Sequence, residues 1–213
     1  MPELHIIGAG GHAKVVVALA EAADYRIAGI YDDSLEACLQ LLGHKITRGL
    51  VNIPDVPETL AFLAIGGNAL RQQLAERFER VQWATLIHPT AWVAPDAAVG
   101  AGSVIMAGCI VQPGVQIGRH VIVNTLAGVD HDCILDDYVH VAPGCRLAGN
   151  VHLAQGLFAG VGAMFTPSSS VGAWSIVGAG AVVNAILPAN VTAVGVPARI
   201  IKERPEDGRE AEL

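Results

Sequence analysis

Charged and aromatic residues are both scarce in this sequence. Asp, Glu, Lys and Arg make up 15% of the 213 residues, and Phe, Trp and Tyr make up 5%. Hydrophobic residues account for 52%, which is enough to bury a sizeable core and argues against disorder. The formal net charge is −7 and no basic cluster is larger than the short 199–204 segment, so nucleic acid is not expected as the main partner.

Paired cysteines and long apolar runs are also missing. The four Cys include no Cys-x-x-Cys pair, which argues against both a zinc knot and a disulfide framework. The apolar segment near the N-terminus, Leu4–Ile7, has only the length of one strand, so we expect neither a signal peptide nor a membrane span. These absences together predict a cytoplasmic protein without a membrane partner.

A six-residue repeat dominates the chain from Val93 to Val183. Sixteen consecutive positions at this spacing are apolar, and fourteen of them are Val, Ile or Leu. A period of six fits neither a helix nor a simple strand. It is typical of a parallel β-helix, in which three repeats close one triangular coil and the branched side chains point inward.

A second row of small or medium-sized residues lies four positions after the first. It includes Cys109, Cys133 and Cys145, which we therefore expect inside the prism. Glycine follows many of the apolar positions, for example at 100, 118, 172 and 178. We expect these glycines to adopt corner conformations in which a Cβ would be strained.

The residues before the repeat alternate between strand and helix patterns. We predict strands over 3–8, 26–31 (ending in Asp32 and Asp33), 60–65 and 83–86, helices over 14–23 and 69–80, and a less regular stretch over 34–59. Such alternation implies a parallel sheet. Cys38 falls in a further predicted helix.

The predicted architecture is thus α/β followed by all-β. It consists of a small Rossmann-like domain over residues 1–87, a left-handed parallel β-helix over 88–200, and a C-terminal tail over 201–213.

The loop from Gly8 to Ala13 fits the dinucleotide fingerprint G-x-G-x-x-G/A and opens a predicted helix. Its backbone N–H groups and the positive end of the helix dipole are suited to a phosphate. Asp32 and Asp33, after the second strand, are acceptors for a sugar or a base. The domain is too short for a full dinucleotide fold, so a nucleotide-sugar is favoured over a nicotinamide cofactor. A purely structural tight turn remains the alternative.

The densest polar segment of the repeat, Val129–Cys133, contains the candidate catalytic residues. His131 lies two places after an inward-facing position, so its imidazole is expected on the outer surface as a general base. Asp132 is placed to fix the imidazole tautomer and to stabilise the imidazolium. The alternative is a surface histidine that happens to follow an acid. Gly149, one coil further on, would offer a backbone N–H to a carbonyl oxygen held near His131.

The other histidines of the repeat do not share this surface. His140 is half a coil from His131, on another face, so only a second subunit would bring the two into one pocket. His120 and His152 are expected to be solvated. None of the four histidines stacks on another across coils, so we predict no metal site. Apolar residues on the outer faces indicate a homotrimer with its threefold axis along the prism: Met106, Ile110, Leu126 and Met164.

Several segments together resemble the PglD/NeuD family of bacterial sugar acyltransferases. The segments are Gly8–His12, Tyr31–Asp33, Ala64–Gly66 with Arg71 nearby, Ile87–Pro89, His131–Asp132, Val139–His140, Ala148–Asn150 and Val194–Arg199. The resemblance implies a homotrimer that uses acetyl-CoA to acetylate the 4-amino group of a nucleotide-linked 4-amino-4,6-dideoxy sugar, with active sites between subunits. O-acetylation of a sialic acid is the alternative within the family. A nicotinamide-dependent enzyme and a non-catalytic scaffold are more distant alternatives.

The resemblance also implies roles for individual residues. His131 corresponds to the general base, Asp132 to the acid that raises its basicity, and Asn124 to a polar residue of the site. Acetyl-CoA contacts fall at His140, Val161 and Ala179, and nucleotide-sugar contacts at Gly10, Gly11, His12, Asp32, Asp33 and Gly66. Direct transfer without an acyl-enzyme is expected, because no Cys is placed as a nucleophile. The nucleotide remains open among UDP, GDP and dTDP.

Overall fold

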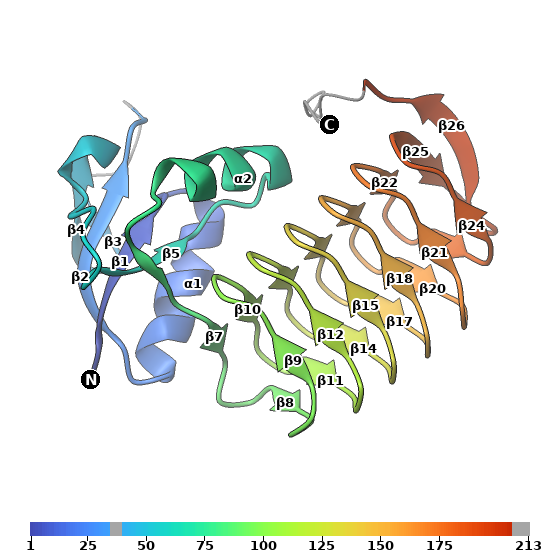
Figure 1. Ribbon diagram of the computed structural model, residues 1–213, viewed down its shortest axis with the longest axis horizontal. Coiled ribbons are helices and arrows are strands. Elements are labelled where there is room, and N and C mark those ends of the chain that lie inside the picture. The colour runs from blue at the N-terminus through green and yellow to red at the C-terminus, as the bar shows by residue number, and fades with distance from the viewer. Residues whose placement is uncertain (35–39, 206–213) are drawn as a thin grey trace.

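The computed structural model describes residues 1–34 and 40–205 and contains an α/β domain followed by a β-helix (Figure 1). The predicted fold class is therefore confirmed. Cys38 with its predicted helix, and the part of the predicted tail beyond residue 205, lie outside the described residues.

The N-terminal sheet has the order β3-β4-β2-β1-β5-β6, and all pairs are parallel except β3 with β4. The strands are β1 (Glu3–Ile7), β2 (Arg26–Asp32), β3 (Gln40–Leu41), β4 (His44–Arg48), β5 (Leu60–Leu63) and β6 (Gln82–Trp83), with a short 3-10 helix at Leu50–Asn52. β4 lies within the stretch that the sequence predicts to be irregular. Its residues are largely polar, with only Ile46 buried, so no apolar pattern marked it.

Two helices pack in this domain, α1 (Gly11–Ala22) and α2 (Asn68–Arg77). α1 begins three residues earlier than predicted, because Gly10 is already extended and serves as its N-cap. It buries Ala13, Val16, Val17, Leu19 and Ala20, a helical spacing of apolar positions. Burying each large side chain of this kind contributes about 1.5–3 kcal/mol. This apolar face belongs to the hydrophobic core that the α/β domain shares with the prism.

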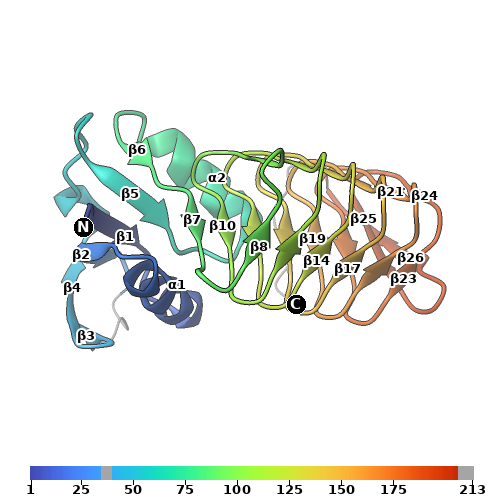
Figure 2. The ribbon, with the colours of Figure 1, turned by 90° about the horizontal axis from the view of Figure 1, so that it is seen from below.

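The β-helix has three faces, and Figure 2 shows its coils stacked side by side. The first face contains β7 (Leu86–Ile87), β10 (Val104–Ile105), β13 (Ile122–Val123), β16 (His140–Val141), β19 (Phe158–Ala159), β22 (Ile176–Val177) and β25 (Val191–Val194), with β26 (Arg199–Glu203) antiparallel at its end. The second contains β8 (Trp92–Val93), β11 (Ile110–Val111), β14 (Gly128–Val129), β17 (Arg146–Leu147), β20 (Met164–Phe165) and β23 (Val182–Val183). The third contains β9 (Ala98–Val99), β12 (Gln116–Ile117), β15 (Ile134–Leu135), β18 (His152–Leu153), β21 (Ser170–Val171) and β24 (Ile186–Leu187).

From β7 to β23, successive strands of one face lie eighteen residues apart, as the repeat predicts: Val104 pairs with Ile122, which pairs with His140. The last pairs, Ser170 with Ile186 and Ile176 with Thr192, are closer in sequence. The inward row is buried from Ile105 to Val183, and the three cysteines of the second row are buried too. The strand predicted over 83–86 is divided, since β6 closes the N-terminal sheet and β7 starts the first face. The prism thus joins the α/β domain directly.

The corners of the coils differ from the prediction. Left-handed backbone recurs every sixth residue, at Gly102, Gly108, Gly114, His120, Leu126, Asp132, Tyr138, Gly144, Asn150, Gly156, Gly162, Ser168, Trp174 and Gly180. The glycines expected to be left-handed, such as Gly100 and Gly118, are not among them. They are required because the next coil is close: a Cβ on Gly118 would lie 2.7 Å from Asp137 N.

The two domains share one hydrophobic core, which runs from Leu4 and Val16 into Val104 and Ile105 of the prism. Met106 belongs to this core and is fully buried, so its expected place on an outer apolar face is wrong. Within the described ranges, neither α1 nor α2 is long and apolar enough to cross a bilayer.

Candidate functional site

His131 and Asp132 lie at the corner between β14 on the second face and β15 on the third. His131 Nδ1 is 2.8 Å from Asp132 Oδ2, and its side chain is 61% exposed. The backbone N–H of His131 donates to Asp130 Oδ1 over 2.8 Å. Because a carboxylate only accepts, Nδ1 carries the proton and Nε2 is left as the basic nitrogen. The hydrogen bond to Asp132 raises the pKa of His131, so this imidazole is a stronger base than usual.

Gly149 lies directly against the His131 ring, one coil along. A Cβ at this position would fall 2.5 Å from His131 Nε2, and the N–H of Asn150 donates to His131 O over 2.9 Å. A side chain on residue 149 would therefore displace the imidazole. A pocket of about 190 Å³ on the second face reaches the same corner through Val129 and Asp130.

A second polar cluster lies where the two domains meet. His140 Nδ1 is 3.2 Å from the carbonyl oxygen of Gly66, and His140 Nε2 is 3.2 Å from Asn124 Nδ2. The ring is 8% exposed, and its centroid is 5.1 Å from that of Phe158 and 6.3 Å from that of His12. Burial lowers the pKa of His140 to about 3, with a further contribution from Arg71, so this imidazole is neutral.

His12 adds a further neutral imidazole to this cluster. Burial, followed by the charge of Arg71, lowers its pKa to about 4. Its Nε2 is buried, and the described residues give it no hydrogen-bond partner. His12 lies in the first turn of α1, immediately after the two glycines of the predicted phosphate loop.

The predicted nucleotide end lies at the carboxyl ends of β1, β2 and β5. β1 is flanked by β2 and β5, so its carboxyl end is the topological switch point at which open α/β sheets bind ligands. Gly10 and Gly11 face open space, where a Cβ would meet nothing within 4 Å. A pocket of about 220 Å³ opens beside them, lined by Ile7, Gly8, Asp32, Asp33, Leu50, Ile65, Leu70 and Leu74.

The two acidic residues of this pocket have different surroundings. Asp32 Oδ2 accepts the N–H of Ala9 over 2.7 Å and thereby braces the glycine loop, while its Oδ1 accepts the N–H of Ser34. Asp33 Oδ1 accepts the N–H of Leu50 over 2.8 Å, and Asp33 is exposed. Asp33 is therefore the more accessible acceptor for a ligand, and Asp32 mainly shapes the loop.

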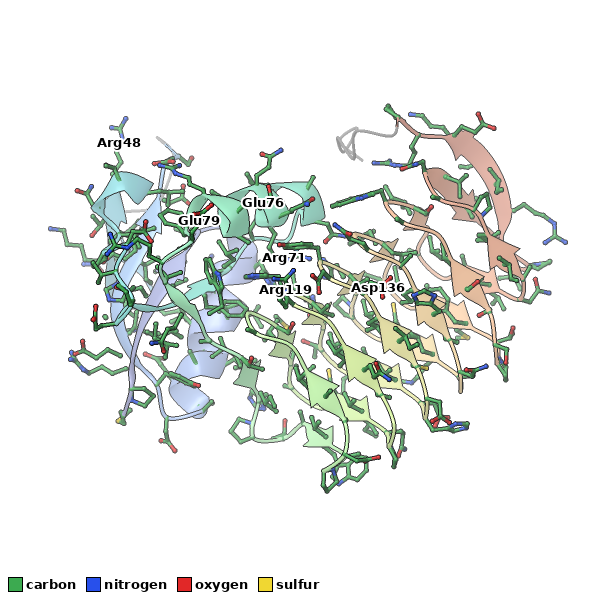
Figure 3. The ribbon with its side chains drawn as sticks, viewed as in Figure 1. Arg48, Arg71, Glu76, Glu79, Arg119 and Asp136 are labelled. Atoms are coloured by element: carbon green, nitrogen blue, oxygen red, sulfur yellow. The ribbon has the colours of Figure 1, made fainter. Side chains whose placement is uncertain are left out.

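Arg71 was noted in the sequence only beside the Ala64–Gly66 segment, and its role at the domain junction was not predicted. Arg71 lies between the α/β domain and the prism (Figure 3), and its side chain is buried. Its guanidinium donates to oxygens of both domains at 2.8–3.1 Å: His120 O, Ile65 O, Gly66 O, Asn68 Oδ1 and Tyr138 O. Asn68 also crosses the junction, donating to Gly156 O and Leu157 O. The signal was the helical spacing of Asn68, Arg71 and Leu74, which places an arginine on the buried face of α2.

His120 was expected to be solvated, and this expectation is wrong. Its ring stacks on Tyr138 at a centroid distance of 5.4 Å and meets the edge of Trp83 from the N-terminal domain. The residue points outward from the prism, as the repeat implies, but the α/β domain covers that corner. His152 is exposed, as expected, and is 3.1 Å from Asp136 Oδ2.

The candidate residues thus form two groups within one chain. His12, Gly66, Asn124 and His140 meet at the domain junction, whereas His131, Asp132 and Gly149 meet at a different corner. The described contacts of His131 involve none of the junction residues.

Val161 and Ala179 lie on the edge after the first face, one coil apart, where the N–H of Gly180 donates to Val161 O. Among the residues that the structure describes, no three His, Cys, Asp or Glu side chains are arranged to hold a metal ion.

Comparison with known proteins identifies both domains. Residues 3–78 match the PglD N-terminal domain. The chain is 43% identical over 119 residues, about half of each protein, to the UDP-N-acetylbacillosamine N-acetyltransferase of Bacillus subtilis. It is 28% identical to the GDP-perosamine N-acetyltransferase of Escherichia coli O157:H7, over 94% of this chain and 96% of that protein.

Solved structures extend the likeness to the whole fold. A histidine-to-alanine mutant of GDP-perosamine N-acetyltransferase from Caulobacter crescentus, in complex with CoA and GDP-perosamine, superposes with a TM-score of 0.90 at 38% identity, over 95% of this chain and 98% of that one. The acetyltransferase domain of PglB from Neisseria gonorrhoeae, in complex with acetyl-CoA, gives 0.87 at 37% identity over 93% and 98%. The family predicted from the sequence is confirmed: the chain belongs to the PglD-type family of N-acetyltransferases of nucleotide-linked amino sugars.

Proposed function

We propose that this protein transfers an acetyl group from acetyl-CoA to the 4-amino group of a nucleotide-linked 4-amino-4,6-dideoxy sugar, with His131 as the general base. The observation that carries the proposal is the pair formed by His131 Nδ1 and Asp132 Oδ2 at 2.8 Å, on an exposed corner of the prism. Solved structures of the similar GDP-perosamine N-acetyltransferase from Caulobacter crescentus hold CoA and GDP-perosamine, which supports the substrate class.

The reaction proceeds by direct attack in a ternary complex. The sugar amine attacks the thioester carbonyl carbon, and a C–N bond forms as the C–S bond breaks. His131 Nε2 takes the proton that the amine loses, and Asp132 stabilises the resulting imidazolium. That proton then passes to the departing CoA thiolate, which restores the neutral imidazole. The backbone N–H of Gly149 is our candidate donor to the carbonyl oxygen as negative charge develops on it.

The described cysteines are unsuited to an acyl-enzyme route. Cys109, Cys133 and Cys145 are buried inside the prism, and burial raises the pKa of Cys109 and Cys145 to about 11. A thiol of that pKa is almost entirely protonated at neutral pH and is a poor nucleophile.

A homotrimer with sites between subunits accounts for the separation of the two groups of residues. Exposed apolar side chains line the second face and its edges, and surfaces of this kind are typical of interfaces: Trp92, Ile110, Leu126, Val161 and Met164. In this arrangement one subunit contributes His131 and its neighbour contributes the edge with Val161 and Ala179. We place the reaction in the cytoplasm, where acetyl-CoA is available.

The experiment that tests the proposed function is a CoA-release assay with UDP-, GDP- and dTDP-linked 4-amino-4,6-dideoxy sugars. We expect release with at least one of them, and a product whose mass increases by one acetyl group on the 4-amino nitrogen. The matched 4-hydroxy sugars and a sialic acid serve as controls. Release with hydroxyl acceptors alone would replace the proposal by O-acetylation, and binding of NADH without CoA release would favour the nicotinamide alternative.

A further inference from the structure

A chain of hydrogen bonds runs from the backbone N–H of Thr125 through the side chains of Asn124 and His140 to the carbonyl oxygen of Gly66, and its two ends fix which atom donates at each step. The backbone N–H of Thr125 can only donate, and it lies 2.8 Å from Asn124 Oδ1. The amide of Asn124 therefore directs its Nδ2 toward His140 Nε2. The carbonyl oxygen of Gly66 can only accept, so His140 Nδ1 carries the proton. The N–H of Thr125 at one end and the carbonyl of Gly66 at the other therefore require the same tautomer of His140, with the proton on Nδ1 and Nε2 as an acceptor.

The Gly66 carbonyl is itself held in place by Arg71. Arg71 Nη1 donates to both Ile65 O and Gly66 O, while its other donors reach His120 O and Tyr138 O on the prism. Gly66 follows β5 at the switch point of the nucleotide-binding sheet. The Gly66 carbonyl thus accepts from both Arg71 and His140, and these two bonds connect the loop at the nucleotide end to the prism.

The ring of His140 is poorly placed to contact a co-substrate. It is 8% exposed, packed between His12 and Phe158, and both of its nitrogens have partners within the protein. Asn124 is less buried and lies on the edge that also carries Val161 and Ala179. Its Nδ2 has a second proton, which the hydrogen bond to His140 leaves for a ligand.

We infer that His140 is a positioning residue, which orients the Asn124 amide for the reaction by accepting its N–H at Nε2 while the Arg71-anchored carbonyl of Gly66 fixes the ring. This inference rests on the proposed function, because Asn124 is a residue of that site. Through this arrangement the loop at the nucleotide end determines the orientation of an amide at the acetyl-transfer end. His140 acts on the reaction only through Asn124.

Two substitutions of His140 separate this role from a direct contact. In His140→Gln the side-chain oxygen can take the place of Nε2 and still accept from Asn124, and Gly66 O keeps its bond from Arg71. In His140→Asn the shorter amide can replace Nδ1 but cannot reach Asn124. We expect His140→Asn to lower kcat about 10- to 100-fold, because the half-buried amide of Asn124 loses its partner and is misaligned, with both KM values within about twofold. His140→Gln should retain kcat within about threefold.

The controls make each outcome decisive. His152→Gln alters an exposed histidine of the prism outside both groups and should leave kcat, both KM values and the melting temperature unchanged. In an Asn124→Ala background, His140→Asn should cost little more, because the residue it orients is gone. Equal losses for Gln and Asn, or a raised KM for acetyl-CoA with kcat retained, would overturn the inference and favour a direct contact with the co-substrate.

A measurement on the unmodified protein covers the case in which a variant does not fold. Histidine ¹⁵N NMR spectra should show His140 as the neutral Nδ1–H tautomer throughout pH 5–8, and an Nε2–H tautomer or an imidazolium would contradict the inference. This readout needs no substrate. If the tautomer is as expected but no 4-amino sugar supports CoA release, the proposed function fails while the hydrogen-bond network stands.

Discussion

His131 and His140 lie nine residues apart on the same β-helix, and their surroundings are opposite. His131 is exposed at a corner, and its partner is a carboxylate that raises its pKa. His140 is buried at the domain junction, and its partners are a carbonyl group and an amide while burial lowers its pKa to about 3. The same side chain is thus prepared as a base in one place and as a fixed neutral acceptor in the other. The difference comes from desolvation and from the charge of the partner.

The substitution with the largest expected effect is His131→Ala, which removes the proposed base and leaves His140 in place. A positioned general base contributes about 10²–10⁴-fold, so we expect kcat to fall by that factor. The melting temperature and both KM values should hardly change, since the imidazole is exposed. Steady-state kinetics and thermal unfolding check both parts. If His131→Ala keeps most of its turnover and His140→Ala is inactive, the base has been assigned to the wrong histidine.

Gly149→Ala tests whether turnover depends on the position of the His131 ring, without removing any functional group. The added Cβ would lie 2.5 Å from His131 Nε2, so the ring must move away from its present position. We expect kcat to fall about 10- to 100-fold, because small misplacements of a reacting group have effects of this size. The backbone of Gly149 is not left-handed, so alanine is tolerated there and the fold should persist. An unchanged kcat would show that the position of His131 against Gly149 is irrelevant to turnover.

Gly11→Ala tests the nucleotide end. A Cβ at Gly11 meets nothing within 4 Å in the free protein, so any effect of this substitution reports a bound ligand. We expect the KM for the nucleotide-sugar to rise about tenfold, equivalent to about 1.4 kcal/mol of lost binding, with the KM for acetyl-CoA unchanged. Competition experiments with the free nucleoside diphosphate check the same site. Equal changes for both substrates, or none, would place the sugar nucleotide elsewhere.

Acid stability separates the buried histidines from the exposed one. Burial lowers the folded-state pKa of His12 and His120 to about 4 and that of His140 to about 3, against 6.5 in the unfolded chain. Above pH 6.5 these histidines are neutral in both the folded and the unfolded state, so they do not oppose folding. As the pH falls from 6.5 toward the folded-state pKa values, the unfolded chain takes up protons at these histidines while the folded protein does not. The free energy of unfolding therefore decreases over this range. Each of them contributes at most about 1.4 kcal/mol of destabilisation per pH unit in that range.

A matched variant isolates this effect from the titration of carboxylates. His140→Gln removes one titrating group, so its melting temperature should fall less steeply between pH 6.5 and pH 4 than that of the unmodified protein. Identical slopes for the two proteins would mean that His140 is not held neutral by the fold.

The six-residue repeat predicted the prism because its inward row is a purely local property of the sequence. The same pattern could not show that the N-terminal domain covers the corner at His120, so this residue was expected to be solvated. Met106 was likewise expected on an outer face and is buried. β4 was missed because its residues are largely polar, and hydrogen bonding to β2 rather than apolar spacing makes it a strand. Glycines at the corners were recognised, but for the wrong reason, since close approach of the next coil is invisible in the sequence.

Only the part of the candidate site that is adjacent in sequence could be predicted. The pair formed by His131 and Asp132 is adjacent in sequence, and the expected exposure of His131 is confirmed. The family, the N-acetyltransferase reaction and acetyl-CoA as co-substrate are confirmed by the comparisons. The network through Gly66, His140 and Asn124 spans more than 70 residues and depends on backbone atoms, whose positions no residue pattern reveals. The roles of the individual site residues, and the trimer, remain predictions.

The pH dependence of kcat/KM, compared between the unmodified protein and Asp132→Asn, tests the central claim most directly. Protonation of the sugar amine gives the same acid limb in both proteins, so any difference between them belongs to the enzyme. The Asp132 carboxylate raises the pKa of His131, and removing its charge should return that pKa toward 6.5 and shift the acid limb of kcat/KM to lower pH. The plateau should also fall, to a smaller extent than in His131→Ala. An acid limb at the same pH in both proteins would contradict the assignment of His131, supported by Asp132, as the base.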